Sequence, residues 1–116
     1  MASPNQPTRP PAFSVVIPAY NAQDYLGAAI ESVLNQTLPP LEIIVIDDGS
    51  TDDTRERLRI YEGRIRYYRQ KNQGIGASRN FGISFAKGDW IALLDADDVW
   101  HPRKLECQSA VIVRNP

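Results

Sequence analysis

The chain has 116 residues, of which 42% are hydrophobic, and its 13 Lys and Arg against 14 Asp and Glu leave a net charge of −1. This length suffices for one globular domain, or part of one, with a core that needs no disulfides. A single cysteine excludes an intrachain disulfide and a thiolate zinc cluster. No apolar run approaches the roughly 18–20 residues that span a bilayer, and the N-terminus lacks the hydrophobic segment of a secretory signal peptide. We therefore expect a cytoplasmic protein of a reducing compartment.

Charge is unevenly distributed along the chain. Residues 1–54 contain one basic and seven acidic residues, whereas residues 55–116 contain twelve basic and seven acidic ones. The basic stretch over 55–71 is compatible with nucleic-acid binding. We favour a solvated helix face and an edge strand, because the whole chain is slightly acidic and lacks aromatic stacking motifs. No nucleic-acid partner is expected.

The first elements follow from proline content and apolar spacing. Residues 1–12 contain four of the nine prolines and almost no apolar side chain, which predicts a disordered tail before a folded domain over 13–116. The apolar runs that follow predict, in chain order, a buried strand over 13–17 stopped by Pro18, an amphipathic helix over about 24–36, and a central strand over 41–46.

The second half of the chain continues this alternation. The predicted elements are a helix over 52–61, an edge strand over 64–69, a helix over 74–86, a strand over 90–94 that is apolar on both faces, and a helix that begins at position 102. Ser50, three residues before Asp53, resembles an N-cap for the first of these helices. Ile75, Phe81 and Phe85 are expected on the apolar side of the second.

Alternating strands and helices predict an α/β fold with a parallel, twisted sheet and helices on both faces. The carboxyl ends of the strands then lie at one edge, where ligands of such sheets bind. Three strand ends supply the residues of the candidate site: Pro18 and Tyr20, then Asp47, Asp48 and Asp52, and finally Asp95, Asp97 and Asp98.

At least four carboxylates and one aromatic ring are therefore expected in one crevice. Neighbouring carboxylates repel one another unless a cation is present, so an Asp-x-Asp pair after a buried strand suggests Mg²⁺ or Mn²⁺. Such an ion would bridge the carboxylates to a diphosphate and assist its departure. Arg79 can add positive charge, Tyr20 can stack on a base, and Asp48 can accept a hydrogen bond from a base N–H. These residues fit a nucleotide whose diphosphate is the leaving group.

At this point the chain resembles the N-terminal half of a family 2 glycosyltransferase with the A-type, Rossmann-like fold. The resemblance covers about residues 13–105, and its strength lies in four motifs in one order and spacing. They are Val15-Val16-Ile17-Pro18-Ala19-Tyr20-Asn21, Val45-Ile46-Asp47-Asp48-Gly49-Ser50-Thr51-Asp52, Asn72-Gln73-Gly74-Ile75-Gly76-Ala77-Ser78-Arg79-Asn80 and Leu94-Asp95-Ala96-Asp97-Asp98, with the helix end at Gln36 as a further match.

The resemblance implies a role for each matched residue. Pro18 and Tyr20 would line the base pocket, and Asp48 would recognise the edge of the base. The remaining assignments place Arg79 near the diphosphate, Asp95 at the ribose or sugar, and Asp97 on a Mn²⁺ or Mg²⁺ ion. The implied activity is inverting transfer of a sugar from a nucleotide-sugar, with a UDP-sugar favoured and dTDP- and GDP-sugars left open.

The chain also departs from the family pattern. The expected catalytic base is an acidic residue well downstream of the Asp-x-Asp motif, and only eighteen residues follow Asp98. We therefore expect a truncated chain that binds a nucleotide-sugar but does not catalyse transfer alone. Its fourth strand would be an exposed apolar edge, open to homo-oligomer formation. The catalytic base, the acceptor and peripheral attachment to a membrane are left open.

Two other interpretations compete with a transferase. A phosphoacceptor signalling domain is α/β and of similar length, but it requires an acidic pair after the first strand and a Lys after a late strand, and this chain has neither. A non-catalytic nucleotide- or partner-binding module with a transferase-like fold is the stronger alternative.

Overall fold

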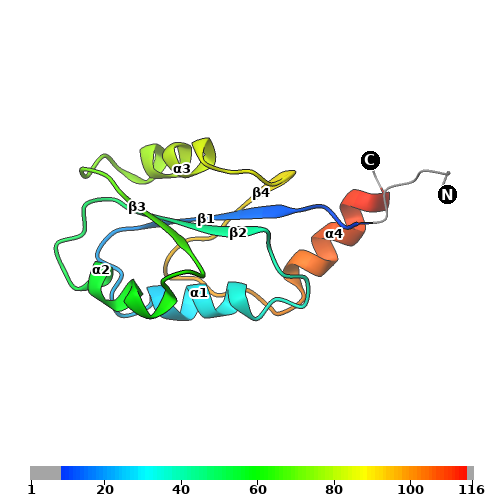
Figure 1. Cartoon of the computed structure of the whole chain (residues 1–116), viewed down its shortest axis with the longest axis horizontal. Helices are drawn as coiled ribbons and strands as arrows, with labels where there is room; N and C mark the ends of the chain where they lie inside the picture. The colour runs from blue at the N-terminus through cyan, green and yellow to red at the C-terminus, as the bar shows by residue number, and fades with distance from the viewer. Residues whose placement is uncertain (1–8, 115–116) are drawn as a thin grey trace.

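Four parallel strands in the order β3-β2-β1-β4 form the centre of the molecule (Figure 1). The structure is a computed structural model that describes residues 9–114. The strands are β1 (Phe13–Ala19), β2 (Glu42–Asp47), β3 (Arg66–Arg69) and β4 (Trp90–Leu93). The α/β class, the parallel sheet and the edge position of β3 are confirmed.

Helices cover both faces of the sheet, as predicted (Figure 1). They are α1 (Leu26–Leu34), α2 (Thr54–Arg57), the 3₁₀ helix η1 (Leu58–Tyr61), α3 (Ile75–Ser84) and α4 (Lys104–Arg114). The helix α3 packs on one face of β1 and β2, and α1 and η1 lie on the other, with Leu105 of α4 in the same core. Within residues 9–114, no helix combines the length and the apolar character that crossing a membrane requires.

The core has a large and a small half because successive side chains of β1 and β2 point to opposite faces. Val15, Ile17 and Val45 belong to the large cluster on the α1 side, whereas Val16 and Ile44 belong to the small cluster under α3. All of these side chains are fully buried. Burying each one contributes roughly 1.5–3 kcal/mol relative to leaving it in water. The two central strands are thus held rigidly, and so are the loops that follow them.

Pro18 does not end the first strand, contrary to the prediction. The strand β1 runs on to Ala19, with Pro18 opposite Ile46 of β2. The Val16 carbonyl accepts from Leu94 on the β4 side, and Pro18, two residues further along, has its backbone nitrogen on that same side. The strand β4 has already ended at Leu93, so the missing proline N–H leaves no ladder bond unmade.

Two details of the predicted helices are also wrong. Ser50 does not cap the helix after β2, because its Oγ accepts from the Asn21 N–H and the helix begins only at Thr54. Of the three apolar residues expected on the buried side of α3, Ile75 and Phe81 are exposed, whereas Phe85 packs against the small core cluster as predicted. The helix instead lies on the sheet through Ser78 and Gly82, whose small size lets the backbone approach β1 and β2 closely.

The predicted tail falls largely outside the described residues. Positions 1–8 of this predicted tail lie outside the described residues. At positions 9–12 the chain contacts the loop before β4: Arg9 pairs with Asp89 (2.9 Å), and the Ala12 N–H donates to the same carboxylate (2.9 Å).

Candidate functional site

The structure brings Pro18, Tyr20 and Asp48 together at the carboxyl edge of the sheet. They line one small hollow, whose other walls are Ala19, Ile75 and Ser78. Tyr20 follows β1, Asp48 follows β2, and the remaining side of the hollow is the first turn of α3. Tyr20 is 49% exposed, so part of its side chain is accessible to a planar ligand.

Asp48 is held by the loop between β3 and α3. Its Oδ1 accepts from Gln70 Nε2 and from the Gln73 N–H (both 2.8 Å), and its Oδ2 accepts from the Gly74 N–H (2.9 Å). Burial raises the pKa of this carboxyl group, but the hydrogen bonds outweigh burial and hold the pKa below its ordinary value. Asp48 is therefore a carboxylate at neutral pH, and it anchors the start of α3.

The loops after β1 and β2 are joined by several hydrogen bonds. The Asn21 N–H donates to Ser50 Oγ (2.9 Å), the Thr51 N–H donates to Asn21 Oδ1 (2.8 Å), and the Ala22 N–H donates to Thr54 Oγ1 (3.0 Å). These bonds leave little freedom between the loop that carries Tyr20 and the loop that carries Asp48. The two walls of the hollow therefore have a defined separation.

Asp47, one of the acidic residues expected at the carboxyl edge, supports the site from beneath and does not line the hollow. Its side chain is fully buried and accepts hydrogen bonds from the Ser50 N–H, from the Tyr67 hydroxyl and from Arg69. Burial and the hydrogen bond to Asp47 raise the pKa of Tyr67 to about 12. The hydroxyl thus stays protonated and remains a donor to Asp47.

Arg79 and Asp95 form a second part of the site, beside the hollow. Arg79 follows Ser78 on α3 and Asp95 follows β4, and their side chains pair at 3.0 Å. Both are only partly buried. The Nε of Arg79 is buried. Among the buried side-chain nitrogen and oxygen atoms of residues 9–114, it is the one that has no hydrogen-bond partner. The guanidinium group therefore retains an unused donor.

The expected crevice of four converging carboxylates is wrong. Within the described part of the chain, no group of three His, Cys, Asp or Glu side chains could hold a metal ion. The buried carboxylates of Asp47 and Asp48 accept hydrogen bonds from the protein as described above, and the half-buried Asp52 accepts from Thr54. Asp97 is exposed, and no described residue donates to its carboxylate.

Asp95 and Asp97 are hard oxygen donors, and two such groups do not complete a protein metal site. They do fit an ion of the Mg²⁺ type, which proteins commonly bind through one or two carboxylates together with phosphate oxygens of the substrate. The donor set therefore fits a cation that is shared with a diphosphate.

Gln70 and Ser78 are site residues that the sequence reasoning missed. Gln70 Nε2 donates to Asp48 Oδ1 and to Ser78 Oγ, so it links the Asp48 carboxylate to α3. The position of Gln70 was a usable signal, because it directly follows the edge strand β3 and therefore also lies at the carboxyl end of a parallel strand. Ser78 had no such signal, because its burial depends on how α3 sits on the sheet.

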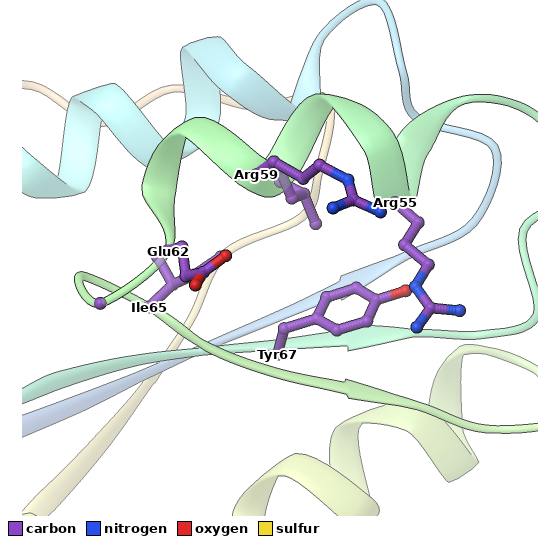
Figure 2. A pocket seen from close by; sticks show the side chains of 7 residues that line it. Arg55, Arg59, Glu62, Ile65 and Tyr67 are labelled. Atoms are coloured by element: carbon purple, nitrogen blue, oxygen red, sulfur yellow. The ribbon is translucent and has the colours of Figure 1, made fainter.

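A second, larger hollow lies between η1 and β3 (Figure 2). Arg55, Arg59, Glu62 and Tyr67 line it, together with Leu58, Gly63 and Ile65. It lies on the α1 side of the sheet, where Leu58 and Tyr67 pack into the large core cluster. None of the six predicted site residues lines it, so we place the candidate site at the hollow that contains Tyr20 and Asp48.

Comparison with known proteins identifies the family. The model of glycosyl transferase family 2 matches residues 14–116. This chain belongs to glycosyl transferase family 2. It is 48% identical over 104 residues to an uncharacterized glycosyltransferase of Rickettsia felis, and this alignment covers 88% of the chain and 17% of that relative. The family 2 chain therefore spans about a sixth of the length of this relative.

Two solved structures with a similar fold are complexes with nucleotide-sugars. TarS of S. aureus in complex with UDP-GlcNAc is 29% identical with a TM-score of 0.80, covering 89% of this family 2 chain and 31% of the TarS chain. The mannosyltransferase PcManGT of Pyrobaculum calidifontis, in complex with GDP-Man and Mn²⁺, is 25% identical with a TM-score of 0.74, covering 90% of this chain and 32% of the other. The Rossmann-like fold class expected from the motifs is confirmed.

Proposed function

We propose that this chain is the donor-binding part of a glycosyltransferase that transfers a sugar from a nucleoside diphosphate to an acceptor hydroxyl. The observation that carries the proposal is the hollow that joins Tyr20 and Asp48 beside the Arg79–Asp95 pair, at the carboxyl edge of a family 2 domain. An aromatic face and a carboxylate can bind a nucleobase, and a guanidinium group beside them can donate hydrogen bonds to the attached phosphates. UDP is the favoured nucleotide, since the TarS complex holds UDP-GlcNAc.

Each residue has a separate role in this proposal. Tyr20 stacks on the base against Pro18, and Asp48, which is charged at neutral pH, accepts from a base N–H. Arg79, whose side chain is partly exposed beside the hollow, binds the diphosphate. Asp95, which Arg79 orients, accepts from a hydroxyl group of the ribose or of the sugar.

Asp97 would hold a Mn²⁺ or Mg²⁺ ion together with phosphate oxygens of the donor. An ion bound there would neutralise negative charge on the departing diphosphate. Support comes from the oxygen donor set of Asp95 and Asp97 and from the Mn²⁺ in the PcManGT complex. Exposure of Asp97 leaves its carboxylate free to meet a ligand-borne cation.

We further propose that these 116 residues bind the donor without completing transfer. Inverting transfer needs a general base near the acceptor hydroxyl. At the carboxyl edge, Asp47, Asp48 and Asp52 are engaged by the protein, and Asp95 and Asp97 are assigned to the donor and its ion. Measurable incorporation of sugar into an acceptor by the 116-residue chain would contradict this part of the proposal. Binding of the donor without any transfer of its sugar would support it.

A thermal-shift screen tests donor binding directly. UDP, GDP and dTDP are compared, each with and without Mn²⁺, because a ligand that binds only the folded chain raises Tm by mass action. We expect UDP with Mn²⁺ to give the largest increase, amounting to about 2.7 kcal/mol of added stability at a concentration of one hundred times Kd. If no nucleotide raises Tm, the proposed function is wrong.

The role of Asp97 has its own variant and control. Asp97→Asn should remove the Mn²⁺-dependent part of the Tm increase and leave the nucleotide-only part unchanged. Glu62→Gln removes the same charge from an exposed loop residue at the opposite edge of the sheet, so it should keep both parts. A full Mn²⁺ effect in Asp97→Asn would show that another group holds the ion.

A further inference from the structure

Asn21 has a backbone conformation that is unusual for its residue type. With φ at +48°, it is the one non-glycine residue of the described chain in the left-handed region. Asparagine tolerates this conformation better than other residues with a side chain, because its short polar side chain can make local hydrogen bonds. Strain of this kind persists only where the surrounding contacts hold it, and it is frequent at functional sites.

The contacts that hold Asn21 all come from the loop after β2. Its N–H donates to Ser50 Oγ (2.9 Å), and its Oδ1 accepts from the Thr51 N–H (2.8 Å) and the Asp52 N–H (3.3 Å). One side chain therefore satisfies two backbone donors of the neighbouring loop. Ser50 is in turn held by Asp47, whose Oδ1 accepts from the Ser50 N–H (2.8 Å).

The position of Asn21 gives these contacts a consequence for the hollow. It directly follows Tyr20, and the loop it binds begins at Asp48. The Tyr20 ring is half-exposed, and no described residue accepts from its hydroxyl, so the direction of the ring depends on the backbone that carries it. A change in the backbone at Asn21 would rotate Tyr20 relative to the anchored Asp48 carboxylate.

We propose that Asn21 is a positioning residue for nucleobase binding: it sets the Tyr20 ring opposite Asp48 through its left-handed backbone and its bonds to the Thr51 and Asp52 N–H groups. This inference rests on the proposed donor-binding function. It adds a residue that does not itself touch the base. Pre-organisation of the pocket means that binding pays no further cost for ordering these two loops.

A residue in the same pair of loops provides a matched structural control. Gln23 Oε1 accepts from the Asp53 N–H at 2.8 Å, so it also joins the two loops through a backbone donor. It lies three residues beyond Tyr20 and does not border the hollow. Loss of the Gln23 bond should therefore weaken the loop contact without turning the Tyr20 ring.

The test compares Asn21→Ala, Asn21→Gly, Asn21→Asp and Gln23→Ala with the unchanged chain. Uridine is the main probe, because it is neutral and reports the base pocket without the diphosphate; guanosine and thymidine are run beside it, and Kd is measured by NMR titration. Urea unfolding of each variant gives its stability. Asn21→Ala should weaken nucleoside binding about tenfold, equivalent to about 1.4 kcal/mol, and Asn21→Gly should lose less, because it keeps the left-handed backbone.

Asn21→Asp keeps both the oxygen acceptor and the tolerance for positive φ, so it should restore Kd to within about threefold of the unchanged chain. Gln23→Ala should lose stability and retain nucleoside affinity. The inference is overturned if Asn21→Ala binds as tightly as the unchanged chain, if Asn21→Asp is as weak as Asn21→Ala, or if Gln23→Ala loses the same affinity. Failure of the unchanged chain to bind any nucleoside or nucleotide would instead reject the proposed function, and this inference with it.

Discussion

At the scale of single residues, Asp48 combines a structural and a binding role. Its two oxygens accept from the Gln70 side chain and from two backbone N–H groups at the start of α3, and almost none of its surface is exposed. A carboxylate in this position organises the hollow before any ligand arrives. The same hydrogen bonds lower its pKa in the folded chain, although burial opposes them. Stability therefore depends on the charge of Asp48.

The lowered pKa of Asp48 predicts a pH-dependent effect of Asp48→Asn. The folded chain binds this proton more weakly than the unfolded chain does, so the stabilisation is complete above the ordinary aspartate pKa of about 3.9 and is lost as pH falls through the lower folded pKa. At pH 7 the variant should lose roughly 1–3 kcal/mol, because its amide N–H₂ cannot accept from a backbone N–H. Urea unfolding at pH 7, 5, 4 and 3 should show the difference shrinking at the acid end.

The exposed Asp97 provides the comparison for this experiment. Asp97→Asn removes the same charge at a carboxylate that receives no hydrogen bond from the described residues, so its stability should follow that of the unchanged chain at each pH. A difference between Asp48→Asn and the unchanged chain that stays constant from pH 7 to pH 3 would contradict the assigned cause.

At the scale of elements, the contact between α3 and the sheet decides where Ser78 and Arg79 lie. The helix packs through Gly82, where an added Cβ would overlap Val16 Cγ1 and come within 3.1 Å of Ile46 Cγ1. Val16 is β-branched and fully buried, so it has no other position to adopt. A larger residue at 82 would lift the helix and move the Arg79 side of the site with it.

Gly82→Ala should therefore destabilise the chain by roughly 1–3 kcal/mol, the usual cost of overpacking a core. Gly76, on the same helix, has no atom within 4 Å of an added Cβ and has an ordinary helical backbone. Gly76→Ala should be neutral or stabilise by up to about 1 kcal/mol, because alanine loses less backbone entropy on folding. Urea unfolding measures both, and equal effects at the two positions would show that close packing is not the reason for Gly82.

At the scale of the whole molecule, the edge formed by β4 is the most exposed apolar part of the sheet. In the part of the chain that the structure describes, β4 pairs only with β1, and Trp90, Ile91 and Leu93 are each 40–49% exposed. Unpaired backbone groups beside apolar side chains favour pairing with another strand. The exposed edge expected from the sequence is confirmed, and we propose that it lets the isolated 116-residue chain self-associate.

Leu93→Lys should reduce this self-association, because a charge on an edge strand opposes pairing. Sedimentation velocity over a range of concentrations measures the effect. Ile60→Lys is the control, since Ile60 is 72% exposed on η1, away from the β4 edge. A monomeric unchanged chain at every concentration, or an equal effect of the two lysine substitutions, would contradict the assignment of self-association to β4.

The sequence by itself determined the order of strands and helices and the edge at which Tyr20 and Asp48 meet. Apolar runs around Val16 and Val45 are too hydrophobic for any position except the centre of a parallel sheet, and the chain connectivity then brings their carboxyl ends to one edge. These are consequences of local patterns and of handedness, so they need no knowledge of individual contacts. Tyr20 and Asp48 could be predicted for this reason.

Only the tertiary structure decided which partner each polar group has. Asp48 is bound by Gln73 and Gly74, and Asn21 binds Thr51, across separations of 25 to 30 residues. Such pairs depend on the order of the strands in the sheet and on how closely α3 approaches the sheet at Gly82. Neither feature can be predicted from a local sequence pattern. The expected crevice with at least four converging carboxylates was wrong for the same reason. Residue spacing indicates that acidic groups reach one edge, whereas the hydrogen-bond donors that engage them come from elsewhere in the fold.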